Sequence, residues 1–216
     1  MRQNTFSLPV LFSASVILLA VELLEVMIIS RTGLHPLLVI GLARTAQAAS
    51  FLIIIRMWGG GLASIGVTGS EVANGLKKGL IWSAGCGLCA AAGCVVLYFL
   101  NVNLQNIFTT PAPGSIVAWV LFFVVGGLIS PLTEEIFFRG IVYGFLRKWS
   151  AILAVLGSTI VFSMVHGITS GVSFIQVVGG LVFAAAYEVE KNLLVPITIH
   201  VLGNIAIFVL SFLLAP

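Results

Sequence analysis

The side chains best suited to acid–base chemistry in this sequence occur in three short segments of its second half. The segments read EEIFFR (from Glu134 to Arg139), FSMVH (from Phe162 to His166) and HVLGN (starting at His200). Together they supply two carboxylates, two imidazoles, a guanidinium and a carboxamide. A helix-to-helix hydrogen bond would explain any one of these groups. Their concentration on three apolar segments instead favours one shared site.

The spacing within each segment predicts which of these groups can meet. Residues four apart share one face of a helix, so Glu135 and Arg139 can pair, and His200 and Asn204 can point into one cavity. Glu134 lies about 100° round the helix from Glu135, so the two carboxylates can have different functions.

The residue types that are missing narrow the chemistry. The sequence contains no aspartate, which excludes intramembrane proteases that use paired aspartates. It contains no His-Glu-x-x-His, which excludes zinc proteases of that type. No serine has a convincing nucleophile context, so serine–histidine chemistry is not favoured. What remains is water activated by a glutamate acting as general base, with Asn204 as a donor to the developing oxyanion.

The composition requires a membrane to hold these segments. Apolar residues make up 60% of the 216 residues and charged residues 8%, against about 25% charged residues in soluble domains. We therefore expect a polytopic α-helical membrane protein. A net charge of +3 does not suggest a nucleic-acid partner. The apolar run from Leu8 to Ser30 is too long for the apolar region of a signal peptide and is expected to be a retained first span.

Windows of about 20 apolar residues predict seven spans. They cover 8–30, 36–57, 79–100, 115–148, 151–169, 172–189 and 192–214. The fourth is too long for one simple crossing: we expect a tilted or broken helix, or a span followed by a partly interfacial helix, with the break near Pro131. The expected fold is an all-α bundle of seven or eight transmembrane helices around an intramembrane polar cavity.

We expect one integral domain, with N-terminal membrane helices over 1–114 and a catalytic core over 115–214. Seven alternating crossings from a cytoplasmic N-terminus put most Lys and Arg residues on the cytoplasmic side, as the positive-inside rule requires. Glu22 and Arg44 lie at similar distances from the turn between the first two spans. We predict that they form an intramembrane ion pair, in preference to a catalytic pair.

The three cysteines, Cys86, Cys89 and Cys94, fall inside one apolar segment. We predict that they are small packing residues of a buried helix, in preference to a metal or redox cluster.

In this order, the three segments resemble the motifs of the CPBP family of intramembrane proteases. That family includes type II CAAX prenyl endopeptidases and bacteriocin-processing or immunity proteins. EEIFFR matches its Glu-Glu-x-x-x-Arg motif, FSMVH its Phe-x-x-x-His and HVLGN its His-x-x-x-Asn. The stretch AAAYEVEKNLLVPITIHVLGNI also resembles the family's final segment. The resemblance covers roughly residues 115–210, and the N-terminal half matches only in its general pattern of spans.

The resemblance implies metal-independent peptide-bond hydrolysis in a conical cavity open to the cytoplasm or the lipid. Carried over residue by residue, it implies that Glu134 activates water and that His166 positions the water or shuttles the proton. His200 and Asn204 would hold the carbonyl oxygen as charge develops on it.

The same resemblance implies a supporting set around these catalytic residues. Glu135 and Arg139 would form a pair that fixes the helix and tunes the base, and Phe162 would support the site. No cofactor is expected, and a catalytic zinc bound by glutamate and histidine is the lesser alternative.

The expected partners are the bilayer, in a prokaryotic cell membrane, and a membrane-tethered or lipid-modified peptide substrate. Two other functions stay open. A non-proteolytic bacteriocin-immunity or scaffold protein could keep the motifs as a polar network. A proton-coupled transporter could use the same groups as a proton path, although the sequence shows no internal repeat.

Overall fold

The computed structural model describes residues 6–103, 114–170 and 174–214, and all regular secondary structure in them is helical. Two short 3₁₀ helices, η1 (Leu62–Ile65) and η2 (Gly69–Glu71), lie in the linker after the second long helix. The long helices are α1 (Leu8–Arg31), α2 (Pro36–Trp58), α3 (Val72–Phe99), the continuous helix Ile116–Leu146, α8 (Ala151–Ser170), α9 (Phe174–Glu190) and α10 (Leu194–Leu214).

Five of these helices are long and apolar enough to cross a membrane: α1, α2, α3, the helix Ile116–Leu146 and α10. The apolar part of α8 and the whole of α9 are shorter, and each extends about 25 Å against a hydrocarbon thickness of about 30 Å. The predicted all-α, multi-pass membrane architecture is confirmed. A helix lies at each of the seven predicted spans, and the described residues contain none that would serve as an eighth.

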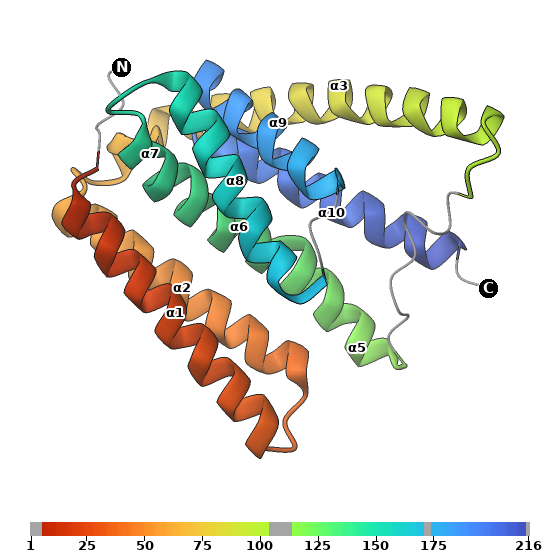
Figure 1. The fold of residues 1–216 in the computed structure, drawn as a ribbon, viewed down its shortest axis with the longest axis horizontal. Coiled ribbons are helices and arrows are strands. Elements are labelled where there is room, and N and C mark those ends of the chain that lie inside the picture. The colour runs from red at the N-terminus through yellow and green to blue at the C-terminus, as the bar shows by residue number, and fades with distance from the viewer. Residues whose placement is uncertain (1–5, 104–113, 171–173, 215–216) are drawn as a thin grey trace.

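The helix Ile116–Leu146 occupies the middle of the bundle and positions the other helices. It contacts α2 on one side and α8 and α10 on others, while α8 packs against α9 and α10 against α3. The helices α1 and α2 form an antiparallel hairpin, seen at the lower left of Figure 1. Both hairpin helices begin with a proline in their first turn, where its fixed φ suits a helix and its missing N–H costs nothing.

The predicted break at Pro131 is wrong, because the helix passes through this residue without interruption. The helix consists of α5 (Ile116–Leu121), η3 (Phe122–Ile129), α6 (Ser130–Glu135), η4 (Ile136–Val142) and α7 (Tyr143–Leu146), of which η3 and η4 are π-helical. A proline inside an α-helix removes a hydrogen bond and crowds the carbonyl four residues earlier. Here the backbone widens before the proline instead, and Ser130 N donates to the carbonyl of Val125, five residues back.

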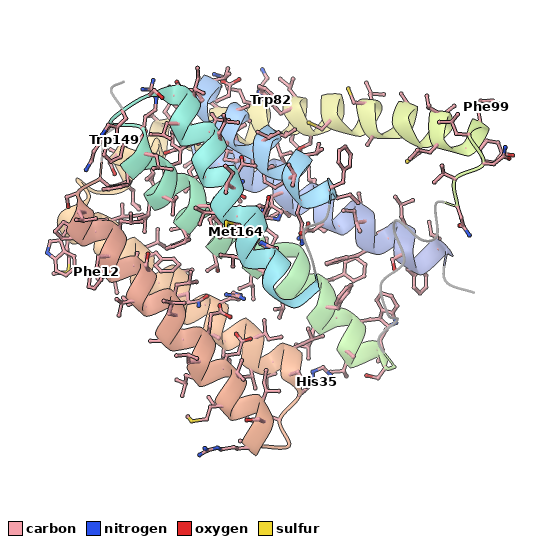
Figure 2. The ribbon with its side chains drawn as sticks, in the orientation of Figure 1. Phe12, His35, Trp82, Phe99, Trp149 and Met164 are labelled. Carbon is pink, nitrogen blue, oxygen red and sulfur yellow. The ribbon has the colours of Figure 1, made fainter. Side chains whose placement is uncertain are left out.

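Helix α3 was predicted to be buried, but most of its surface is not covered by the rest of the described chain. Its buried residues are Gly75, which lies against Asn192 in the turn before α10, and Gly79, which lies against Thr198 of α10. Its far half extends beyond the other helices towards Phe99 (Figures 1 and 2), which is 76% exposed. The three cysteines are free thiols with exposed or intermediate side chains. Cys86 packs against the cluster that contains Phe183 and Ile199, as predicted for a packing residue, but Cys89 is exposed and the predicted burial of the helix is wrong.

The predicted ion pair between Glu22 and Arg44 is confirmed, and it joins α1 to α2. Gln47 completes the group: Arg44 Nη1 donates to Gln47 Oε1 at 2.9 Å, and Gln47 Nε2 donates to Glu22 Oε1 at 3.1 Å. Glu22, Arg44 and Gln47 thus bond to one another across the hairpin.

A second charged group lies where α9 ends. Glu188 pairs with Arg147 at 3.0 Å and with Lys191 at 2.6 Å, and Glu190 pairs with Lys78 at 2.6 Å. These cations are among those that the positive-inside rule places on the cytoplasmic side, so their clustering at one end of the bundle agrees with the expected topology.

The linker between α2 and α3 is fastened to the turn between α9 and α10. Leu193 N donates to the carbonyl of Ile65 at 3.1 Å, and Asn192 Nδ2 donates to the carbonyl of Glu71 at 3.1 Å. Gly66, at the end of η1, has a φ of +78°, and a Cβ there would lie 1.8 Å from the carbonyl oxygen of Lys191. Only glycine permits this approach.

We predict that Gly66→Ala destabilises the protein by at least about 1 kcal/mol, because the left-handed conformation strains a residue with a Cβ and the backbone contact adds to this cost. Thermal unfolding in detergent measures the effect. Gly69→Ala is the matched control, since a Cβ at Gly69 meets no atom within 4 Å. Equal melting temperatures for the two variants would contradict the prediction.

Candidate active site

The structure brings together all three motif segments, which lie on three different helices. Glu134 and Glu135 end α6, Arg139 follows on η4, and His166 and His200 lie on α8 and α10. Helix α6 contacts α10, and η4 contacts α8, so the segments meet in the middle of the bundle (Figure 1). The third histidine, His35, lies at the turn between α1 and α2, away from this region (Figure 2).

The innermost part of the site is the predicted pair between Glu135 and Arg139, which is confirmed. The two side chains, four residues apart on one helix face, are 0% exposed, and Arg139 Nη1 lies 2.8 Å from Glu135 Oε1. Arg139 Nη2 donates to the carbonyl of Gly180 on α9 at 3.1 Å. Glu135 Oε1 also lies 2.8 Å from His200 Nδ1. One carboxylate oxygen thus links two helices, and the arginine links a third.

Two phenylalanine rings enclose this pair. The Arg139 guanidinium carbon lies 4.7 Å from the ring centre of Phe162 and 5.3 Å from that of Phe183, within the range of cation–π attraction. His200 stacks on Phe183 with ring centres 4.5 Å apart and an interplanar angle of 20°. Phe162, predicted as a supporting residue, also contacts His166 with ring centres 4.3 Å apart.

Phe183 and Gly180 belong to the site, and the sequence analysis did not identify them. A Cβ on Gly180 would lie 3.0 Å from Thr159 Cγ2 and 3.3 Å from Phe162 Cδ1, so glycine is what lets α9 approach α8 and present its carbonyl to Arg139. In the sequence they look like ordinary members of an apolar helix. The only available signal was their spacing, since residues three apart lie on one face of α9.

Glu134, in contrast, turns its carboxylate towards two imidazoles. Its Oε2 lies 3.5 Å from His166 Nε2 and 3.7 Å from His200 Nε2. Both distances exceed an ordinary hydrogen bond. The Glu134 side chain is 17% exposed and that of His166 is 27% exposed, so this half of the site is less enclosed than the Glu135–Arg139 pair.

The partners of the two rings assign their protons. His166 Nδ1 lies 2.9 Å from the carbonyl of Phe162. A carbonyl can only accept, so Nδ1 carries the hydrogen. His200 Nδ1 faces the Glu135 carboxylate, which also accepts while it pairs with Arg139. In their neutral forms both rings therefore present an accepting Nε2 towards Glu134.

Asn204 lies one turn beyond His200 on α10 and donates from Nδ2 to the carbonyl of Gly126, 2.9 Å away on η3. This bond fixes the carboxamide against the π-helical segment that precedes Pro131. Its predicted contact with a substrate carbonyl oxygen stays a prediction.

A metal site would need at least three suitable ligands close together. Across the described ranges, no group of three or more His, Cys or Glu side chains is placed to hold a metal ion. Metal independence stays a prediction, as does the intramembrane polar cavity. An apolar groove of about 460 Å³ lies elsewhere, between α1 and α2 and lined by residues such as Phe12 and Trp58.

Comparisons with known proteins give a match to one family model and matches to two curated relatives. Residues 113–206 match the model of the type II CAAX prenyl endopeptidase Rce1-like family. Over 121 residues, 56% of its length, the chain is 28% identical to "Putative membrane peptidase YdiL" of Bacillus subtilis (strain 168). Over 93 residues, 39% of its length, it is 37% identical to "Membrane-embedded CAAX protease MroQ" of Staphylococcus aureus (strain USA300).

These matches cover 49% of YdiL and 36% of MroQ, so the chain spans about half or less of the curated relatives that it matches. No solved structure matches the chain. The family resemblance that the motifs suggested is nevertheless confirmed. Residues 113–206, which contain every residue of the predicted site, carry the similarity to the type II CAAX prenyl endopeptidase Rce1-like family.

Proposed function

We propose that this protein is a membrane-embedded endopeptidase in which Glu134 activates water to hydrolyse a peptide bond of a membrane-associated substrate. The observation that carries the proposal is the difference between two adjacent carboxylates. Glu135 is fully buried and bonded to Arg139 and His200, whereas Glu134 is partly exposed and faces two imidazole Nε2 atoms.

This geometry supports general-base chemistry at Glu134. A water held between its carboxylate and an accepting Nε2 would donate one hydrogen to each, which directs an oxygen lone pair away from both. As that oxygen bonds to the carbonyl carbon, its proton moves to Glu134 and the carbonyl becomes an oxyanion. When the tetrahedral intermediate breaks its carbon–nitrogen bond, the proton passes to the leaving amine, directly or through His166.

The remaining roles in this proposal follow from the bonds that fix each group. Asn204 uses one amide hydrogen on Gly126, and its other hydrogen would be a donor to the oxyanion. His200 is oriented by Glu135, so the buried ion pair sets the direction of an imidazole that the water contacts. The substrate class is proposed from the membrane setting, and the relative named as a CAAX protease makes a lipid-modified peptide the first to test.

We expect purified protein in detergent to cleave a membrane-tethered peptide and Glu134→Gln to reduce this activity at least about a hundredfold, since general-base catalysis is worth that much. A panel of prenylated and unprenylated peptides would be assayed with and without a strong chelator. Glu71→Gln is the control, because Glu71 lies in η2 outside the site. Activity that survives Glu134→Gln would contradict the general-base role, and inhibition by the chelator would contradict metal independence. Failure to cleave any peptide would favour the scaffold function.

His166→Ala and His200→Ala should each lower kcat at least about tenfold, but they should differ in stability. His200 loses a buried bond to a charged carboxylate, which is worth about 1.5–3 kcal/mol, as well as its stacking on Phe183. The more exposed His166 loses a bond to a backbone carbonyl. Thermal unfolding of the two variants should therefore show the larger loss for His200→Ala. The assigned roles would be wrong if either variant kept the wild-type kcat.

Arg139→Ala should destabilise the protein by about 3–5 kcal/mol, because it leaves the Glu135 charge buried without a cation. Denaturation in mixed detergent measures this loss. Arg147→Ala provides a matched control: its pair with Glu188 is 33% and 23% exposed, and such pairs contribute about 0–1 kcal/mol. The double variant Glu135→Gln/Arg139→Met should recover part of the stability. A stable Arg139→Ala variant would show that the Glu135 charge is compensated in another way.

A further inference from the structure

Arg44 connects the N-terminal hairpin to the turn of helix that carries Glu134. Thr133, which directly precedes Glu134 and is buried, shares its hydroxyl hydrogen between the carbonyls of Arg44 at 3.0 Å and Ile129 at 2.9 Å. The bond to Arg44 joins α2 to α6. The backbone of α2 therefore contacts the catalytic helix one residue from the proposed base.

The side chain of Arg44 is fixed as firmly as its backbone. Its Nη1 donates to Glu22 and to Gln47 Oε1, and Gln47 Nε2 donates back to Glu22 Oε1. Gln47 is fully buried, and it also donates to the carbonyl of Leu18 on α1. Glu25, a second and mostly buried carboxylate on α1, lies within electrostatic range of Arg44. These contacts hold the guanidinium between the two helices of the hairpin.

The charge of Arg44 extends its influence to the active site. It interacts electrostatically with Glu134 and with His166. Arg139 also interacts with Glu134, but it is fully buried and bonded to Glu135. Arg44 is 21% exposed, so like Glu134 and His166 it is only partly enclosed. In an apolar surrounding, where water screens little, a fixed cation can stabilise the charge of a carboxylate even when other groups contribute more.

We infer that Arg44 is a positioning residue of the active site, which holds the Glu134 carboxylate in its working place through the charge of its guanidinium and the bond from Thr133 to its carbonyl. This inference rests on the proposed function of Glu134. It assigns a part in the reaction to the hairpin α1–α2, which lies outside the segment 113–206 that matches the family. The ion pair with Glu22 then has a purpose beyond joining two helices, because it keeps the cation from turning away.

The test uses the double variant Glu22→Gln/Arg44→Gln in the full chain, because removing both charges leaves neither one buried without a partner. We expect kcat to fall about tenfold to a hundredfold while KM stays within about twofold, since a base that is misplaced loses part of its catalytic contribution but not the substrate contacts. Arg44→Lys, which keeps the cation, should restore most of the activity. Arg56→Gln removes a charge from an exposed position on the same helix and serves as the matched control. All values are compared at a temperature at which thermal unfolding shows every variant to be folded.

A double variant with the wild-type kcat would overturn the inference, as would an Arg44→Lys variant as slow as the double variant. An effect confined to KM would also overturn it, because that result would make Arg44 a substrate contact. Glu134→Gln is assayed in parallel to separate the two ideas. If Glu134→Gln remains active, the proposed function fails. If Glu134→Gln is inactive while the double variant is fully active, the inference alone fails.

Discussion

Arg139 and Glu135 carry two opposite charges with no exposed side-chain surface, in the middle of a bundle whose core is largely apolar. Removing such charges from water is costly, and each charge depends on the other for compensation. The surrounding structure follows from this need. Gly180 brings α9 close enough to supply a carbonyl, Phe162 and Phe183 supply ring faces, and His200 supplies a hydrogen bond from α10. Three helices are therefore arranged around one ion pair.

That arrangement explains how neighbouring glutamates acquire different properties. One step along a helix turns a side chain by about 100°, so Glu135 points into the buried cluster and Glu134 points towards the less enclosed side. The same imidazole contacts both carboxylates, through Nδ1 at 2.8 Å and Nε2 at 3.7 Å. Glu135, whose role is structural, thus orients the His200 ring that faces Glu134, the proposed base. Damage to the ion pair is expected to reach the reaction through this ring as well as through the stability of the fold.

Sequence reasoning succeeded where the physical rule is local. Hydrophobic windows located seven helices, and spacing of four residues identified the pair Glu135–Arg139. It failed where the outcome depends on neighbours that the sequence does not reveal. Pro131 was expected to break its helix, but the backbone absorbs it by widening into π-helical turns. The cysteines of α3 looked buried because they are small and apolar, although only Cys86 packs against the buried cluster of α9 and α10, and Cys89 is exposed. Phe183 and Gly180 belong to none of the three motifs, and they take part in the site only because α9 packs on α8.

The hydrogen bond from His166 Nδ1 to the carbonyl of Phe162 has a consequence for proton traffic. A ring anchored in this way can exchange a proton only at Nε2, and His200 is restricted similarly by Glu135. Neither imidazole can relay a proton from one nitrogen to the other without detaching from its anchor. Each ring can therefore take up and release a proton only at Nε2, and it does not conduct protons into the interior of the bundle. A proton taken from water at this site would be stored and returned on the same side, so a full turnover would need no path for protons through the membrane.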